Sequence, residues 1–118
     1  MKFIKPSVHG ALDYIAALAL IAIPFLLGFE GLALWLSVAG GVGLIAYSLL
    51  TDYALSVAKV LPFDFHIIFD SLAAVVFIAA PFVFGFTGIV QIYYIVMGLG
   101  VLVVVAFSSK DQAEPKQN

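Results

Sequence analysis

Long apolar segments separated by short polar breaks make up most of this chain. Four of these segments have the length of a membrane-spanning helix, because roughly twenty residues at about 1.5 Å per residue cross the ~30 Å hydrocarbon core. The breaks within each half of the chain are short and glycine-bounded, which favours antiparallel neighbours. The pattern predicts an all-α fold, an integral membrane four-helix bundle built from two tandem transmembrane hairpins. Its predicted spans are Ala11–Phe29, Leu32–Leu50, Ile67–Phe86 and Ile89–Phe107.

The second half of the chain repeats the first, and each residue of a matching pair lies 57 residues from the other. Each repeat holds two helices, so both halves run in the same sense, and a pseudo-two-fold axis along the membrane normal should relate them. We divide the chain into a first hairpin (1–54), a cytoplasmic-side connection (55–65), a second hairpin (66–107) and a polar tail (108–118) that we expect to be disordered. The repeated pairs include His9/His66, Asp13/Asp70, Pro24/Pro81, Phe25/Phe82, Gly28/Gly85, Phe29/Phe86, Gly31/Gly88, Gly41/Gly98 and Gly43/Gly100.

Composition and charge agree with a location in the lipid bilayer. Hydrophobic residues make up 64% of the chain and charged residues 10%, with a mean hydropathy of +1.20, outside the usual range of soluble domains. The net charge of -2 and the lack of a basic patch argue against nucleic acid as a partner. By the positive-inside rule, the lysines predict a multi-pass protein of a bacterial inner membrane with both termini in the cytoplasm. They are Lys2, Lys5, Lys59, Lys110 and Lys116.

Prolines and glycines are predicted to shape the helices. A proline inside a helix removes one backbone donor and leaves the carbonyl four residues earlier unpaired, which usually bends the helix. Small residues let helix backbones approach closely in lipid, either within the chain or in a homo-oligomer or larger membrane complex. The residues assigned these structural roles are Pro24, Pro81, Gly28, Gly85, Gly41, Gly43, Gly98 and Gly100.

Two histidines and two aspartates are the chemistry-bearing residues that the duplication preserves. His9 and Asp13 are four residues apart and share one helix face, as do His66 and Asp70. Because a charge facing lipid is costly, both faces should point into the protein. One interpretation is structural: each aspartate accepts hydrogen bonds near a helix start, and the four residues hold the two hairpins together.

Two other interpretations of the same residues stay open. If the first and third helices meet, two imidazoles and two carboxylates form a ligand set suited to Zn²⁺, Mn²⁺ or Fe²⁺, or a proton relay, and Asp52 could add a further oxygen. Alternatively, His9 and His66 could be axial ligands of haem or a pigment. The sequence contains no cysteine, and it shows no nucleophile–base pair that would suggest catalysis. We therefore expect a non-enzymatic accessory or assembly module that binds no cofactor. A metal-ion or proton transporter is the alternative.

The repeated motif also resembles a known family. A His-x3-Asp helix followed by a proline–aromatic pair and a Gly-Phe exit, present twice in a four-helix chain, is similar to the bacterial SPW-repeat integral membrane proteins. The signature tripeptide here is Ile23-Pro24-Phe25 and Ala80-Pro81-Phe82, so its serine and tryptophan are both replaced. The resemblance implies a small multi-pass membrane protein and supplies no reaction.

Overall fold

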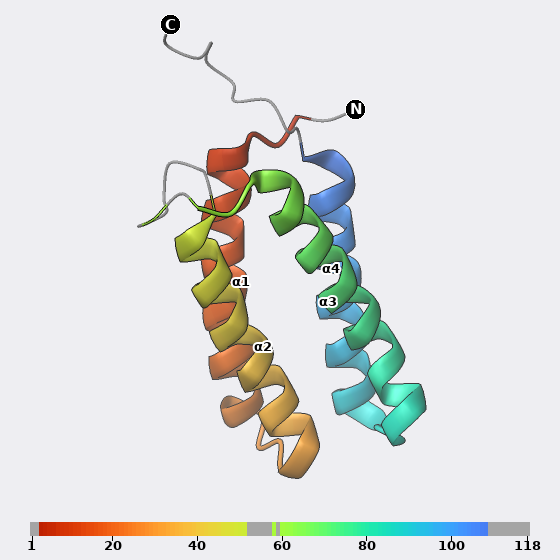
Figure 1. Ribbon diagram of the computed structural model, residues 1–118. Coiled ribbons are helices and arrows are strands. Elements are labelled where there is room, and N and C mark those ends of the chain that lie inside the picture. The colour runs from red at the N-terminus through yellow and green to blue at the C-terminus, as the bar shows by residue number, and fades with distance from the viewer. Residues whose placement is uncertain (1–2, 52–57, 59, 109–118) are drawn as a thin grey trace, which may run out of the picture.

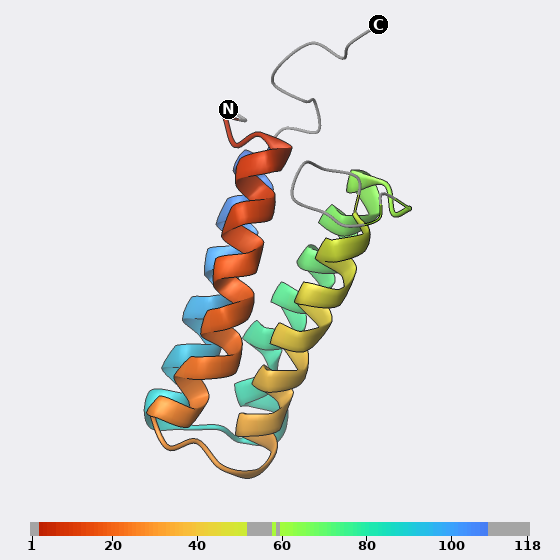
Figure 2. The same ribbon diagram turned by 90° about the vertical axis from the view of Figure 1, so that its left-hand side faces the viewer.

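Four long helices form two antiparallel hairpins packed side by side (Figures 1 and 2). The computed structural model describes residues 3–51, 58 and 60–108. Each helix is long and apolar enough to cross a membrane, which confirms the predicted all-α fold. Asp52, much of the connection and residues 109–118 of the tail lie outside the described residues. The helices are α1 (Pro6–Leu26), α2 (Gly31–Leu50), α3 (Phe63–Phe84) and α4 (Gly88–Phe107).

The first helix of each hairpin begins earlier than predicted. Helix α1 starts at Pro6 rather than Ala11, and α3 starts at Phe63, directly after Pro62, rather than at Ile67. Proline suits a helix start because its φ angle is already helical and its missing N–H would have no partner there. Hydropathy placed these starts too late, because the apolar spans begin only after the polar residues His9 and His66. Both histidines consequently lie within helices, one turn from their beginnings.

Glycines end the first helix of each hairpin. Gly28 and Gly85 both have a φ of +74°, in the left-handed region that residues with a Cβ rarely adopt. After α1, the Phe29 N–H donates to the Pro24 carbonyl at 2.8 Å, which closes the last turn. The chain can therefore reverse within a few residues, and it places the second helix against the first.

Glycine also sets the closeness of the two helices within each hairpin. A Cβ built on Gly41 would lie 2.8 Å from the Ala17 carbonyl oxygen, and one on Gly98 would lie 2.8 Å from the Ala74 carbonyl oxygen. Both contacts are tighter than a real side chain allows, so only glycine fits. The two contacts join equivalent positions of the two repeats, and the duplication thus repeats the packing within the hairpin.

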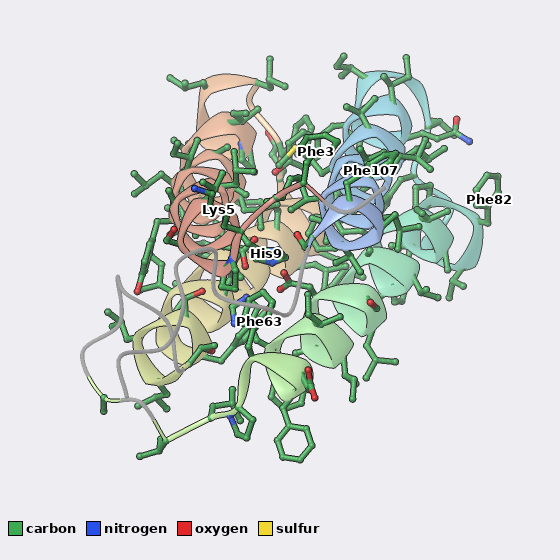
Figure 3. All side chains as sticks on the ribbon, turned by 90° about the horizontal axis from the view of Figure 1, so that it is seen from above. Phe3, Lys5, His9, Phe63, Phe82 and Phe107 are labelled. Carbon is green, nitrogen blue, oxygen red and sulfur yellow. The ribbon has the colours of Figure 1, made fainter. Side chains whose placement is uncertain are left out.

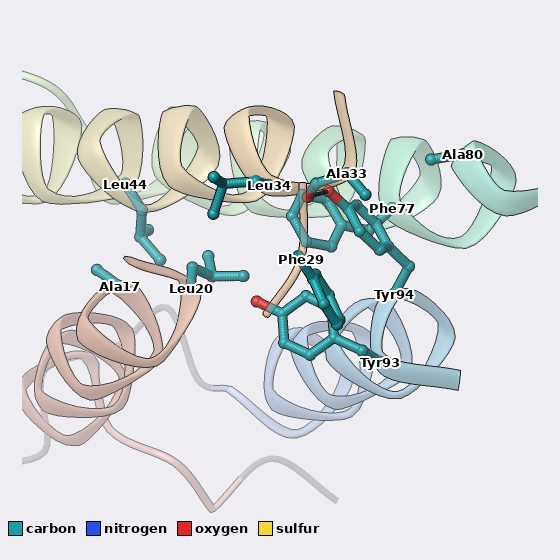
Figure 4. Packing of buried hydrophobic residues seen from close by; sticks show 10 residues of the cluster. All are labelled: Ala17, Leu20, Phe29, Ala33, Leu34, Leu44, Phe77, Ala80, Tyr93 and Tyr94. Atoms are coloured by element: carbon teal, nitrogen blue, oxygen red, sulfur yellow. Dashed lines mark hydrogen bonds between the residues drawn. The ribbon is translucent and has the colours of Figure 1, made fainter. Parts of the chain in front are cut away.

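Aromatic side chains fill much of the space between the hairpins in the half near the turns (Figure 4). A polar contact joins three helices there. Pro24 lacks an N–H, which leaves the Leu20 carbonyl without its helical partner, and the Ser37 hydroxyl donates to that carbonyl at 2.8 Å. Tyr93 of α4 in turn lies 2.6 Å from the Ser37 oxygen, to which its hydroxyl donates because the serine proton is already used. The proline thus creates an acceptor that ties α1, α2 and α4 together.

Short backbone contacts join the hairpins at the opposite end. Ile4 pairs in parallel with Ser108, and Leu61 pairs in the same way with Thr51. The Ile4 N–H donates to the Phe107 carbonyl at 2.9 Å, and the Leu61 N–H donates to the Leu50 carbonyl at 2.7 Å. These two bonds again join equivalent positions of the repeats, as a pseudo-two-fold arrangement requires. The segment before each hairpin is therefore fixed to the end of the other.

The glycine contacts predict that an added methyl group destabilises the protein at some glycines and not at others. Gly41→Ala and Gly98→Ala should each lower the free energy of unfolding by about 1–3 kcal/mol, because the new Cβ meets a backbone oxygen. Gly43→Ala and Gly100→Ala are matched controls, since a Cβ at either position has no atom within 4 Å. Circular dichroism during SDS titration in detergent measures the difference. Equal losses at all four positions would contradict the packing described.

Candidate metal centre

The two histidines and two aspartates of the duplicated motif come together in one buried cluster. His9, Asp13, His66 and Asp70 each offer one ligand atom, and these four atoms all lie within 4.8 Å of one another. None of the four residues is more than 4% exposed. Figure 3, seen from above, shows His9 and Phe63 near the middle of the four helices, at the end where α1 and α3 begin. The cluster therefore lies inside the protein, away from lipid.

Each histidine contacts the aspartate of the other repeat more closely than its own. His9 Nε2 lies 2.9 Å from Asp70 Oδ2 and 3.1 Å from Asp13 Oδ2. His66 Nε2 makes its shorter contact with Asp13 Oδ2 and lies 3.4 Å from Asp70 Oδ2. One oxygen of each aspartate thus faces both imidazoles. The four ligand atoms form a closed ring in which nitrogen and oxygen alternate.

Two hydroxyl groups hold the far sides of the imidazoles, and these residues were missed by the sequence reasoning. His9 Nδ1 lies 2.6 Å from Ser108 Oγ, and His66 Nδ1 lies 2.7 Å from Thr51 Oγ1. Each hydroxyl comes from the other repeat. Thr51 and Ser108 themselves occupy equivalent positions, so the repeat contained the signal, as two hydroxyl residues directly after the second helix of each hairpin.

These hydroxyls determine which imidazole nitrogen carries the proton. Thr51 Oγ1 donates to the Tyr47 carbonyl and Ser108 Oγ to the Val104 carbonyl, both at 2.6 Å. Having used its single proton, each hydroxyl must accept from Nδ1–H. A neutral imidazole then has a lone pair at Nε2, directed at the carboxylate oxygens. An imidazole lone pair and a carboxylate oxygen repel each other unless a proton or a metal cation lies between them.

Three sides of the ring have the spacing of a four-coordinate metal ion. Ligands about 2.0 Å from a tetrahedral centre lie about 3.3 Å from one another. Three of the four nitrogen–oxygen separations, at 2.9, 3.1 and 3.4 Å, lie around that value, whereas the His66 Nε2–Asp13 Oδ2 contact is shorter and would have to lengthen around an ion. Hydrogen bonds on the second imidazole nitrogen are the usual outer support of histidine ligands. The donor set and its supports therefore match a site for a divalent transition metal.

Aromatic rings surround the cluster and leave no slot for a haem between the imidazoles. The His9 and His66 rings meet edge to face with centroids 5.4 Å apart, and Phe63 packs 5.2 Å from His9 and 6.0 Å from His66. Both Nε2 atoms point at carboxylates instead of at opposite faces of a macrocycle. The geometry of the two imidazoles therefore does not suit the haem interpretation.

Tyrosine breaks the symmetry of the centre on one side. The Tyr47 hydroxyl donates to Asp70 Oδ1, the carboxylate oxygen that does not face the imidazoles. The equivalent position of the second repeat is Val104, which has no such group. Asp70 is therefore fixed through both of its oxygens. Asp52, the fifth candidate ligand from the sequence, lies outside the described residues.

The fold and centre define an internally duplicated, multi-pass membrane protein of four helices. A family model, the SPW repeat domain, matches residues 7–109, and the chain belongs to this family. The match confirms the resemblance carried by the repeated His-x3-Asp and proline–aromatic motifs. No curated protein and no solved structure matches the chain.

The outer hydroxyls predict a stability effect. Ser108→Ala and Thr51→Val should each lower the free energy of unfolding by about 1–3 kcal/mol, because a buried Nδ1–H loses its acceptor. Ser71→Ala is the control, since its hydroxyl bonds to the Ile67 carbonyl of its own helix. SDS titration followed by circular dichroism compares the three variants. A loss for Ser71→Ala as large as for the other two would count against the orienting role of Thr51 and Ser108.

Proposed function

We propose that this protein binds one divalent transition-metal ion within the membrane, through His9, Asp13, His66 and Asp70. The observation that carries the proposal is the direction of the imidazole lone pairs. With Nδ1–H donated to a hydroxyl, each Nε2 is left facing two carboxylate oxygens. Two carboxylates, two neutral imidazoles and a divalent cation also sum to zero net charge, which suits an apolar interior.

At His9 the spacing favours a metal over a proton, whereas the short contact of His66 Nε2 with Asp13 Oδ2 is that of a hydrogen bond. A proton on His9 Nε2 points in one direction, whereas Asp13 and Asp70 oxygens lie at nearly equal distances of 3.1 and 2.9 Å. A metal ion at the middle of the ring satisfies all four atoms at once. Two nitrogens and two oxygens suit Zn²⁺ best, with Mn²⁺ and Fe²⁺ as further candidates, whereas Mg²⁺ and Ca²⁺ prefer oxygen alone.

The role we propose for the ion is binding that joins the two hairpins, without catalysis. Each repeat supplies one histidine and one aspartate, so the ion would connect α1 to α3. The lysine distribution supports placing this centre near the cytoplasmic side, with both termini there. A transported ion would also need a path through the other half of the bundle. The side chains of that region, such as Leu20, Phe77 and Tyr94, are apolar or aromatic, which supports a held ion over a moving one.

An accessory role in a larger membrane assembly is the second candidate. Open space beside Gly43 and Gly100 supports it, because a second helix could approach the backbone closely there. Gly41 and Gly98 are already used inside the hairpins and add nothing to this idea. The two roles are compatible, since a bound ion would stiffen the surface offered to a partner.

Metal titration tests the proposed function. Co²⁺ added to purified, chelator-treated protein in detergent should give the visible bands of a four-coordinate ion at one equivalent, and Zn²⁺ should displace them. The double variant His9→Ala/His66→Ala should lose both responses. Bound metal should also raise the SDS midpoint, because it binds the folded state and not the unfolded one.

The control for this titration is Asp64→Asn, which changes an exposed carboxylate at the start of α3. It should bind Co²⁺ as the unaltered chain does. A stable chain that binds no metal, and loses stability when either histidine is replaced, would refute the proposal and assign the cluster to a hydrogen-bonded clasp.

A further inference from the structure

A cavity lies beside the histidine–aspartate cluster, among the helices of the bundle. Its volume is about 190 Å³, and α2, α3 and α4 supply most of its lining. Tyr47 and Asp70, which are hydrogen-bonded to each other, are the polar side chains of this lining. The rest is glycine, alanine and larger apolar side chains, among them Leu44, Phe77 and Met97. An apolar cavity with polar groups at one place is the usual form of a small-molecule site.

The cavity results from differences between the two repeats. Gly40 lines it, where a Cβ would lie 3.3 Å from the Phe77 ring, and the equivalent residue of the second repeat is Met97, which also lines it. Tyr47, which places a hydroxyl group in the lining, corresponds to Val104. The duplication is therefore broken at the residues that make the cavity and give it a polar group.

One edge of the cavity is accessible from lipid. Ala73 of α3 is exposed and Gly43 of α2 is half-buried, and both belong to the lining. Neither carries a side chain beyond Cβ, so neither can cover the opening. A molecule dissolved in the bilayer can therefore enter between α2 and α3.

We propose that this cavity binds an apolar molecule bearing a hydroxyl group, such as a phenol, taken from the bilayer. The Tyr47 proton is donated to Asp70 Oδ1, so this part of the wall presents oxygen acceptors. A ligand must then supply the donor, and a carboxylate oxygen has room for a second hydrogen bond. A cavity of about 150 Å³ holds benzene. The larger volume here accommodates one aromatic ring with a short substituent beside Leu44, Phe77 and Met97.

This proposal does not depend on the metal. Asp70 faces the imidazoles through Oδ2 and the Tyr47 hydroxyl through Oδ1. The cavity ligand would use Oδ1, and the ion would use Oδ2. The two ideas can therefore fail separately.

Methionine NMR tests the cavity directly, because the chain contains two methionines and Met97 lines the cavity. With ¹³C-methyl methionine in detergent-solubilised protein, 4-ethylphenol should shift the Met97 methyl signal saturably and leave Met1 unchanged. The probe 4-ethyltoluene has the same shape without the donor. It should bind about tenfold to a hundredfold more weakly, the usual worth of one hydrogen bond to a charged group.

A variant that fills the cavity is a second test, and it has a matched control. Gly43→Leu adds a side chain at a lining position where a Cβ meets no atom within 4 Å, and it should abolish the Met97 response. Gly100→Leu adds the same side chain at the repeat-related position, which also has open space, and should leave the response intact. If Gly43→Leu does not fold, Gly43→Ala should still weaken 4-ethylphenol binding.

Three outcomes would overturn the proposal. The first is equal binding of both probes, which would mean that the cavity binds plain hydrocarbon. The second is a Met97 signal that does not saturate. The third is an undiminished response in a folded Gly43→Leu variant. The His9→Ala/His66→Ala variant separates this result from the proposed function. It should lose Co²⁺ binding while Met97 still responds to 4-ethylphenol.

Discussion

The crossed contacts between two histidines and two aspartates are the constraint on which the arrangement of this protein depends. Charged and polar groups at this depth must be satisfied by the protein itself, because lipid offers neither hydrogen bonds nor ions. His9 lies closer to Asp70 than to Asp13, and His66 lies closer to Asp13 than to Asp70, so each histidine has its shortest contact in the other repeat. The polar groups that are costliest to bury thereby fix how the two hairpins sit together.

The two levels of assembly use different physics. Within a hairpin, Gly41 and Gly98 bring helix backbones into contact, as expected where lipid removes the hydrophobic drive between helices. Between hairpins, polar contacts act at two depths. The histidine–aspartate cluster with its outer hydroxyls lies at one end, and the Tyr93–Ser37 contact lies toward the turns. The proline that interrupts α1 is part of the second contact, because it supplies the Leu20 acceptor.

Sequence periodicity was sufficient for the fold, and it placed the four ionisable residues on inward faces. Their convergence was expected only if the first and third helices meet. The apolar spans began later than α1 and α3 do, since hydropathy leaves out the polar first turn of each helix, although His9 and His66 were correctly placed on helix faces. Sequence periodicity also missed Thr51 and Ser108, because a lone hydroxyl after a helix has no distinctive pattern until the structure shows the imidazole beside it. The role of Gly40 was not predictable for a similar reason. A cavity is the space left between several packed helices, so it cannot be predicted from any one segment of the sequence.

Zinc-edge X-ray absorption on the zinc-loaded protein tests the central claim most directly, because it reports the atoms bound to the ion. We expect four light ligands at about 2.0 Å, with the outer-shell scattering of two imidazole rings. Loss of one imidazole in His9→Ala and of one in His66→Ala would confirm that both repeats contribute. A spectrum without imidazole scattering, or an all-oxygen six-coordinate ion, would contradict it.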